Sequence, residues 1–243
     1  MRSWKRPPRL VACTKEEVHV WRVTLQPTHL DTDAHWTLLS EDERERANRF
    51  HFEADRVHYI ARRAILRRLL SRYLPISPGD IRFEYGEHGK PHVPHQGKGM
   101  GFTFNASHSD EWMLAAIGCG TRLGVDVEKR RMDIDHSGVV SYFSKLEQSE
   151  WHALAEADRL DAFYRCWTRK EAFVKAHGTG LAFGLSNFDV TLRPTDPPAV
   201  RHVRGAEPRG WTVHDVDPGG MYAGSVITEH SSRLRTWDWQ ARE

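Results

Sequence analysis

The decapeptide Trp167-Thr168-Arg169-Lys170-Glu171-Ala172-Phe173-Val174-Lys175-Ala176 carries the strongest pattern in the chain. It contains good helix formers and no Pro or Gly, and His177-Gly178 just beyond it is typical of a helix end. Glu171 lies on an apolar side of this predicted helix, where a carboxylate needs a cation as its partner. Lys175 is one turn further on and within i,i+4 reach of Glu171. An ordinary edge salt bridge and a metal-bound carboxylate both remain open from this stretch alone.

The composition is that of a globular protein without strong charge bias. Of 243 residues, 39% are hydrophobic and 28% charged, and the net charge is +2. This balance argues against a nucleic-acid-binding particle. The three cysteines, Cys13, Cys119 and Cys166, form no CxxC pair, which suits a reducing compartment. Because no apolar run follows the basic N-terminus or could span a bilayer, we expect a cytoplasmic protein that does not insert into membranes.

The order of predicted elements occurs twice along the chain. The capping-box patterns Ser40-Glu41-Asp42-Glu43 and Ser144-Lys145-Leu146-Glu147 each open a long helical region, reaching about Tyr73 and Ala176. Strand patterns flank both regions, at 16–25, 80–85, 101–105 and 112–118 in the first half and at 123–127, 188–192, 211–214 and 221–228 in the second. Glu-Ala-Asp-Arg also appears at both 53–56 and 156–159. This order suggests one duplicated unit.

The predicted fold is therefore an α+β pseudodimer of two similar α/β-type subdomains. Each is expected to be a small, mostly antiparallel sheet packed with one long helix, with boundaries at 1–120 and 121–243. A cleft between two such halves is a preferred ligand site, so we expect the active site at their interface. The internal duplication makes a working monomer the expected state.

The segment Gly124-Val125-Asp126-Val127-Glu128-Lys129 predicts a strand with two carboxylates on one face. Residues two apart point the same way, so Asp126 and Glu128 face away from the core that takes Val125 and Val127. With Glu171 they would offer three hard oxygen donors, the ligands that Mg²⁺ prefers. The alternative is a solvated strand edge that binds nothing.

Three further features could bind anions. Arg49, Arg56, Arg63 and Arg67 lie near one stripe of the first helical region, where we expect one or two of them at an anion site and the others solvated. Lys90 is held in the short turn Gly89-Lys90-Pro91. The stretch Ala106-Ser107-His108-Ser109-Asp110 is interpreted as a polar turn whose hydroxyl, imidazole and N–H groups could bind phosphate oxygens. No nucleophile elbow surrounds its serines, so a hydrolase triad is a poor fit.

These pieces, in this order, resemble the 4′-phosphopantetheinyl transferases of the larger, surfactin-synthetase-activating (Sfp) type. That family shows G-K-P, F-N-x-S-H-S, G-x-D-x-E and W-x-x-K-E-x-x-x-K, which this chain matches at 89–91, 104–109, 124–128 and 167–175. Ala106 replaces a larger aliphatic residue, which is interpreted as a packing change. The resemblance runs from about residue 40 to about 190, and the tail beyond about 228 carries none.

The resemblance implies transfer of the 4′-phosphopantetheine arm of coenzyme A to a serine of an acyl or peptidyl carrier protein, with release of adenosine 3′,5′-bisphosphate. The N-terminal half would contact the nucleotide and the carrier, and the C-terminal half would hold the metal site and the catalytic helix. The implied metal is Mg²⁺, with Mn²⁺ as an alternative. The implied roles are metal binding by Asp126, Glu128 and Glu171, base catalysis by Glu171, a phosphate contact by Lys175 at the leaving group, and coenzyme A binding by Arg63, Lys90, Ser107 and His108.

Two other functions are weighed against this one. A Mg²⁺-dependent nuclease would use the same carboxylates, but no aromatic-basic interleaving forms a nucleic-acid groove. A non-catalytic carrier-binding module would not need the three carboxylates and the lysine that are all present. The expected partners are coenzyme A and a carrier protein that presents an acidic helix.

Overall fold

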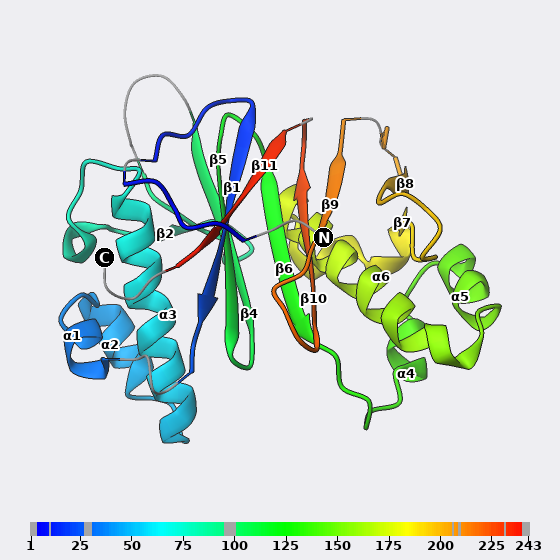
Figure 1. Ribbon diagram of the computed structural model, residues 1–243, viewed down its shortest axis with the longest axis horizontal. Coiled ribbons are helices and arrows are strands. Elements are labelled where there is room, and N and C mark those ends of the chain that lie inside the picture. Colours follow the sequence, from blue (N-terminus) through cyan, green and yellow to red (C-terminus); the bar gives the residue numbers. More distant parts are fainter. Residues whose placement is uncertain are drawn as a thin grey trace.

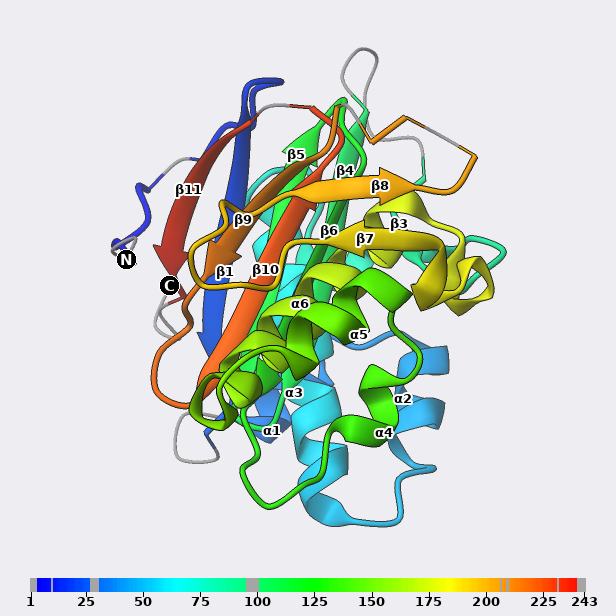
Figure 2. The same ribbon diagram turned by 90° about the vertical axis from the view of Figure 1, so that its right-hand side faces the viewer.

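The computed structural model describes residues 4–9, 11–26, 31–94, 101–205, 207–208, 210–230 and 232–239. Figure 1 shows strands in the middle of the molecule, with one long helix on each side. The helix on the N-terminal side is α3 (Glu53–Ser71), and the helix on the other side is α6 (Glu156–His177). Figure 2, turned by 90°, shows α6 lying across the strands of the C-terminal half. The fold is thus α+β, with two sheets each packed against a long helix.

The N-terminal sheet has four strands in the order β11-β1-β5-β4. Its strands are β1 (Glu17–Thr24), β4 (Phe102–Ser109), β5 (Trp112–Cys119) and β11 (Arg233–Asp238). β5 pairs antiparallel with β1 and β4, whereas β11 runs parallel to β1. Around this sheet lie α1 (Thr32–Trp36), α2 (Glu41–Ala47), the 3₁₀ turn η2 (Pro78–Asp80) and the short hairpin of β2 (Glu84–Tyr85) and β3 (Pro91–His92).

The C-terminal sheet is antiparallel and has the order β6-β10-β9. Its strands are β6 (Leu123–Lys129), β9 (Thr212–Val216) and β10 (Tyr222–Thr228). A separate hairpin joins β7 (Phe188–Val190) to β8 (Val200–Val203). The remaining elements are α4 (Ser137–Val140), α5 (Lys145–His152), η3 (Gly180–Phe183) and η4 (Leu185–Asn187).

The period-2 alternation of the strands builds a four-layer arrangement of helix, sheet, sheet and helix. Val18 and Val20 of β1 pack with Val125 and Val127 of β6 in a core between the two sheets, while Trp21 turns to the opposite face. A second core lies between the N-terminal sheet and α3, and a third lies between the C-terminal sheet and α5 and α6. Because one face of β6 packs into the apolar core, the other face, which carries Asp126 and Glu128, is turned to α6.

The helical expectations hold in part. Both capping boxes form, at Ser40 and Ser144. Each helical region is divided, however, because α2 ends at Ala47 before α3 begins, and α5 ends at His152 before α6 begins. The expected strand at 80–85 shrinks to the two residues of β2. The duplication of one unit remains a prediction, because the two sheets differ in strand number and order.

The expected polar turn at 106–110 is wrong. Residues 106–109 continue β4, and the reversal occurs at Asp110-Glu111 between β4 and β5. Asp110 has φ 43°, a left-handed conformation that Asp tolerates better than most residues. Because β4 is a strand here, Ser107 and Ser109 point to one side and His108 to the other.

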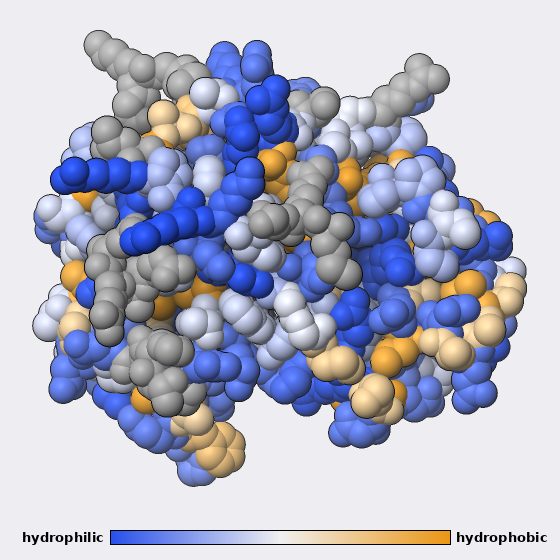
Figure 3. Space-filling model, viewed as in Figure 1, coloured by the Kyte–Doolittle hydropathy of each residue, from blue (hydrophilic) through white to orange (hydrophobic). Residues whose placement is uncertain are grey.

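A segment of the tail beyond residue 228, namely β11, is part of the N-terminal sheet. β11 returns from the C-terminal half and pairs with β1 over Glu17↔Arg233 to Arg22↔Asp238. The surface viewed as in Figure 1 is hollowed at the lower edge, where the two halves meet (Figure 3). A cavity of about 500 Å³ is lined by residues of both halves, including His58, Arg62 and Lys129.

Candidate active site

β4 and β6 belong to different sheets, and polar side chains of β4 join them. Asn105 Oδ1 accepts the backbone N–H of Val125 at 2.9 Å. Ser107 Oγ donates to Asp126 Oδ1 at 2.8 Å, and Ser109 Oγ donates to Glu128 Oε2 at 2.9 Å. These three residues occupy alternate positions of one strand, so they share the face that meets β6. The N-terminal half therefore holds the two carboxylates of β6 through hydroxyl groups.

Gly124 lets α6 approach β6 closely. A Cβ built at this position would lie 2.1 Å from the carbonyl oxygen of Ala172 and 2.5 Å from the backbone nitrogen of Ala176. Real Cβ atoms do not approach backbone atoms so closely, so only glycine fits. The close approach brings Glu171, which precedes Ala172, and Lys175, which precedes Ala176, over the strand that carries Asp126.

The carboxylates of Asp126, Glu128 and Glu171 lie near the contact of β6 with α6, close enough to influence one another's ionisation. Burial, followed by the neighbouring Asp126 carboxylate, raises the pKa of both Glu128 and Glu171. Burial also raises the pKa of Asp126, which is 2% exposed, although the Lys175 ammonium acts in the opposite direction. Three acidic groups that hinder one another's ionisation form a site that favours a cation.

Lys175 supplies one such cation, but its partner differs from the expected one. Its Nζ lies 2.6 Å from Asp126 Oδ1 and donates to Ser107 Oγ at 2.9 Å. Lys175 forms this contact across the helix–strand interface in place of the i,i+4 ion pair with Glu171 that the helical spacing allows. A buried carboxylate gains more from an ammonium than a half-exposed one does, because it has lost more hydration.

The donor set fits a divalent metal ion. Asp126 Oδ2 is buried and has no hydrogen-bond partner among the described residues, which a bound cation would provide. Carboxylate oxygens are the ligands that Mg²⁺ and Mn²⁺ take. Within the same described ranges, no three His, Cys, Asp or Glu side chains are already gathered closely enough to hold an ion. The side chains would have to draw together on binding, as mutually repelling carboxylates do when a cation neutralises them.

His108 lies on the other side of β4, toward α3, where Arg62 binds its Nε2. Desolvation and the Arg62 guanidinium lower the pKa of His108 to about 4, so the ring is neutral and accepts this hydrogen bond. Arg62, Arg63 and Arg46 line a cavity of about 250 Å³ together with Ser107 and His108. Two of the expected ligands, Ser107 and His108, thus meet three arginines, a setting suited to phosphate groups.

Lys90 is close to this cavity but already has two partners. Its Nζ donates to the carbonyl oxygens of Leu123 at 2.8 Å and Lys175 at 2.7 Å. Burial lowers its pKa to about 8. Lys90 therefore ties the β2–β3 hairpin to the start of β6 and to the last turn of α6. A second cavity, of about 220 Å³, lies beside it and is lined by Gly89, Pro91 and Lys175.

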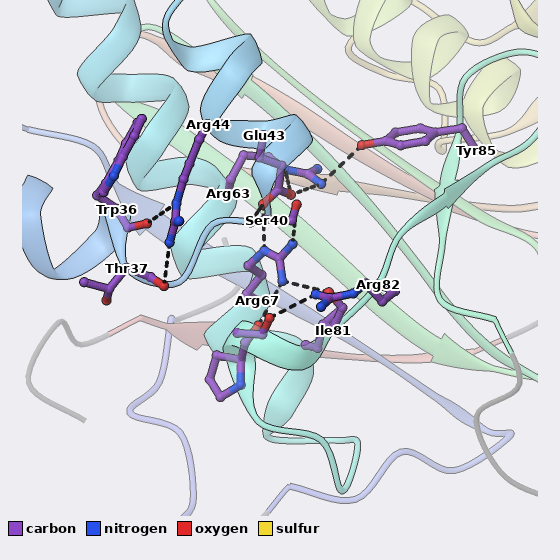
Figure 4. Close-up of polar contacts among 12 residues, drawn as sticks. Trp36, Thr37, Ser40, Glu43, Arg44, Arg63, Arg67, Ile81, Arg82 and Tyr85 are labelled. Carbon is purple, nitrogen blue, oxygen red and sulfur yellow. Dashed lines mark hydrogen bonds and ion pairs between the residues drawn. The ribbon is translucent and has the colours of Figure 1, made fainter.

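Of the arginine stripe, Arg63 and Arg67 are paired with Glu43 (Figure 4). Arg67 is fully buried and also donates to the carbonyls of Pro78 and Ile81, so it is a structural residue. Arg63 donates from Nε to Glu43 at 2.6 Å and reaches the hydroxyl of Tyr85. Arg49 and Arg56 pair with Glu45 and Glu53 at the surface. Of these four arginines, Arg63 alone lines the cavity.

Several residues of the site are absent from the sequence-based expectation. Arg62 has no role in the sequence-based interpretation, and Gly124 and Ser109 enter it only as letters of the family motifs. Lys170 is fully buried and bonds Glu147 Oε2 and the carbonyls of Leu185 and Phe188, each at 2.7 Å. Adjacent residues of a helix face different sides, so the position of Lys170 next to Glu171 was the available signal that Lys170 contacts other elements than Glu171 does.

Comparison with known proteins assigns the family. Residues 122–228 match the model of the 4′-phosphopantetheinyl transferase superfamily, and residues 23–119 match the model of a 4′-phosphopantetheinyl transferase N-terminal domain. Similar proteins include the 4′-phosphopantetheinyl transferase HetI of Nostoc sp., 34% identical over 80% of this chain and 82% of its own. The 4′-phosphopantetheinyl transferase Sfp of Bacillus subtilis is 30% identical over 80% and 84%.

The chain belongs to the 4′-phosphopantetheinyl transferase family. The resemblance seen in the sequence is thereby confirmed, and the chain is a phosphopantetheinyl transferase of the Sfp type that acts on carrier proteins. Enzymes of this family use coenzyme A and, in general, Mg²⁺. In the described part of this transferase, no helix combines the length and apolar character that a bilayer crossing needs.

Proposed function

We propose that this transferase moves the phosphopantetheine arm of coenzyme A to a carrier-protein serine at the junction of β4, β6 and α6. The observation that supports this most is the contact of Lys175 with Asp126, near Glu128 and Glu171 and beside an arginine-lined cavity. Carboxylates for a metal and guanidinium groups for phosphates are the two halves of a phosphoryl-transfer site. Each half comes from a different subdomain.

The nucleotide would occupy the two cavities that adjoin Gly89 and Pro91. Arg62, Arg63 and His108 would contact phosphate oxygens from the N-terminal side, and Ser107 and Lys90 would contact the nucleotide near Lys175. Guanidinium groups bind phosphate in a bidentate manner, and the neutral His108 can donate from its other ring nitrogen. Arg46 lines the same cavity, and we add it to the candidate ligands.

Asp126, Glu128 and Glu171 would hold Mg²⁺, or Mn²⁺ in its place. When bound, the ion supplies positive charge at the pyrophosphate and so favours attack on phosphorus. Asp126 Oδ2 offers the free, buried oxygen, and Glu128 and Glu171 offer oxygens from the two sides of the contact. Ser107 and Ser109 fix the positions of the first two carboxylates.

Glu171 is the candidate base, because it is half-buried and its pKa is raised by burial and by Asp126. It would accept the proton of the carrier serine hydroxyl as that oxygen forms a bond to the β-phosphorus of coenzyme A. The bond from this phosphorus to the bridging oxygen breaks, and adenosine 3′,5′-bisphosphate leaves. Lys175 would move from Asp126 to the departing phosphate and offset its charge.

The sequence suggests the N-terminal half as the carrier contact, but the exposed apolar surface beside this site favours docking of the carrier protein on the C-terminal half. Four of the exposed large hydrophobic side chains of this half lie in or near α4 and α5, namely Met132, Ile134, Tyr142 and Leu146. Figure 3 shows hydrophobic surface in this region, at the lower right and next to the hollow. Arg130 and Arg131 border it, and Arg131 is about half-exposed. Apolar side chains with a basic rim are complementary to an amphipathic acidic helix.

The test is transfer by Glu171→Gln, followed by intact-mass analysis of apo carrier proteins incubated with coenzyme A and Mg²⁺. We expect the rate to fall by about 10²–10⁴-fold, the usual contribution of a general base. Glu156→Gln, at the exposed start of the same helix, is the matched control and should retain full activity. Wild-type activity in Glu171→Gln would refute the role, and plasmid cleavage without carrier modification would support the nuclease alternative.

A further inference from the structure

Ser109 lies at the end of β4, where the N-terminal half meets the second carboxylate of β6. Its Oγ donates to Glu128 Oε2 at 2.9 Å and accepts the backbone N–H of Lys129 at 3.1 Å. A hydroxyl has one proton, and the N–H of Lys129 approaches a lone pair, so the proton is directed to the carboxylate. The backbone of β6 thereby fixes the orientation of this hydroxyl.

Glu128 needs such a holder because of its position on β6. Asp126 is buried and is fixed by Ser107 and Lys175, whereas Glu128 lies near the strand end and is less buried. In addition to Ser109, the nearby indole of Trp167 favours the ionised form of this carboxylate and lowers its pKa, against the effect of burial. The Trp167 ring stacks on Phe163, with 6.2 Å between ring centroids, which limits its movement. Side chains of β4 and α6 therefore both act on Glu128.

We propose that Ser109 is a positioning residue that holds Glu128 in the orientation needed to bind the divalent ion. This inference rests on the proposed function of the same site. Ser109 Oγ donates to Oε2 and not to the other carboxylate oxygen, Oε1. Groups that orient the ligands of a metal typically contribute 10–100-fold to metal affinity, and Ser109 has this relation to Glu128.

The role separates Ser109 from its neighbours in the same motif. Ser107 contacts Asp126 and Lys175 and lines the cavity of the nucleotide, so its loss would disturb several functions at once. Ser109 does not line that cavity, and among the described residues its side-chain hydrogen bonds lead to β6 alone. Its replacement should change metal affinity while leaving nucleotide binding unaltered.

The experiment is calorimetric titration of Mn²⁺ into the full-length protein in the presence of coenzyme A. We expect Ser109→Ala to weaken Mn²⁺ binding by about 10–100-fold, with the Kd for coenzyme A measured without metal unchanged. Ser109→Thr keeps the hydroxyl and should bind Mn²⁺ like the wild type. Ser71→Ala removes a hydroxyl that donates to the Arg68 carbonyl within α3, and it should have no effect.

Kinetics provide the second readout. The Mg²⁺ concentration needed for half-maximal rate should rise in Ser109→Ala, while kcat at saturating Mg²⁺ stays close to the wild-type value. A lowered Tm with unchanged Mn²⁺ affinity would overturn the proposal and leave the proposed function intact. Absence of Mn²⁺ binding in the wild type would overturn both. Should Ser109→Ala not fold, Ser109→Cys keeps the size with a much weaker donor, and wild-type Mn²⁺ affinity in it would count equally against the proposal.

Discussion

Replacing Gly124 by alanine places a carbon atom inside the contact between β6 and α6. That carbon would lie 2.1 Å from the Ala172 carbonyl oxygen, 2.5 Å from the Ala176 nitrogen and 2.9 Å from Lys175 Cβ. A C···O contact needs about 3.3 Å or more, so the helix must retreat by roughly 1 Å. The first two obstacles are backbone atoms, which cannot turn away as a side-chain tip can. The displacement therefore reaches Glu171 and Lys175 directly.

The retreat should reduce kcat by about 10²-fold, since a misplacement of about 1 Å has that effect on a positioned catalytic group. Overpacking of this kind also destabilises by about 1–3 kcal/mol. For a chain of this size each 1 kcal/mol lowers Tm by about 2–4 °C, which gives a decrease of about 2–12 °C. The assays are carrier modification by intact mass and thermal unfolding by circular dichroism.

Gly79→Ala is the matched control, because an added Cβ there meets no atom within 4 Å. It should keep both kcat and Tm. Wild-type kcat in Gly124→Ala, with α6 still folded, would refute the view that the helix–strand distance sets the geometry of the site. A loss of stability without a loss of kcat would show that α6 adjusts elsewhere and that Glu171 and Lys175 do not depend on this contact.

Two further predictions concern the buried ion pair and the carrier. Lys170→Met removes the ammonium beside the fully buried Glu147 carboxylate and should lower the free energy of unfolding, measured by urea denaturation, by about 3–5 kcal/mol. The double variant Lys170→Met and Glu147→Gln should regain part of this loss. An unchanged unfolding midpoint in the single variant would contradict the assignment of a buried ion pair. The KM for an acidic carrier should rise as NaCl increases from about 0.05 to about 0.5 M, while the KM for coenzyme A changes less. A carrier KM that does not respond to salt would exclude docking on the basic rim.

The strand periodicity was sufficient to predict the orientation of the β6 carboxylates. Val125 and Val127 alternate with Asp126 and Glu128, and the structure places the valines between the sheets as this pattern requires. The capping boxes likewise marked two helix starts, because their signal lies within four residues. Such local rules need no knowledge of neighbouring elements.

The partner of Lys175 could not be predicted in this way. Helical spacing makes Glu171 its natural neighbour, but the choice of Asp126 depends on how closely α6 approaches β6 and on the burial of that carboxylate. The strand character of 106–109 was similarly hidden, since polar residues on β4 face another strand instead of solvent. β11 gave no signal either, because pairing with β1 depends on the path of the whole C-terminal half.

Contacts near the two chain ends explain why the N-terminal and C-terminal halves keep a fixed position relative to each other, although no continuous sheet joins them. The Trp4 indole donates to the Asp217 carbonyl at 2.6 Å, so the N-terminal segment reaches the C-terminal half. Arg22 of β1 forms a bidentate pair with Asp238 of β11 and stacks against Trp4. Each end of the chain thus crosses to the opposite half. Together with the hydroxyl contacts of β4, these crossings hold the arginine-lined cavity and the carboxylates at a constant separation, which a reaction that depends on positioning requires.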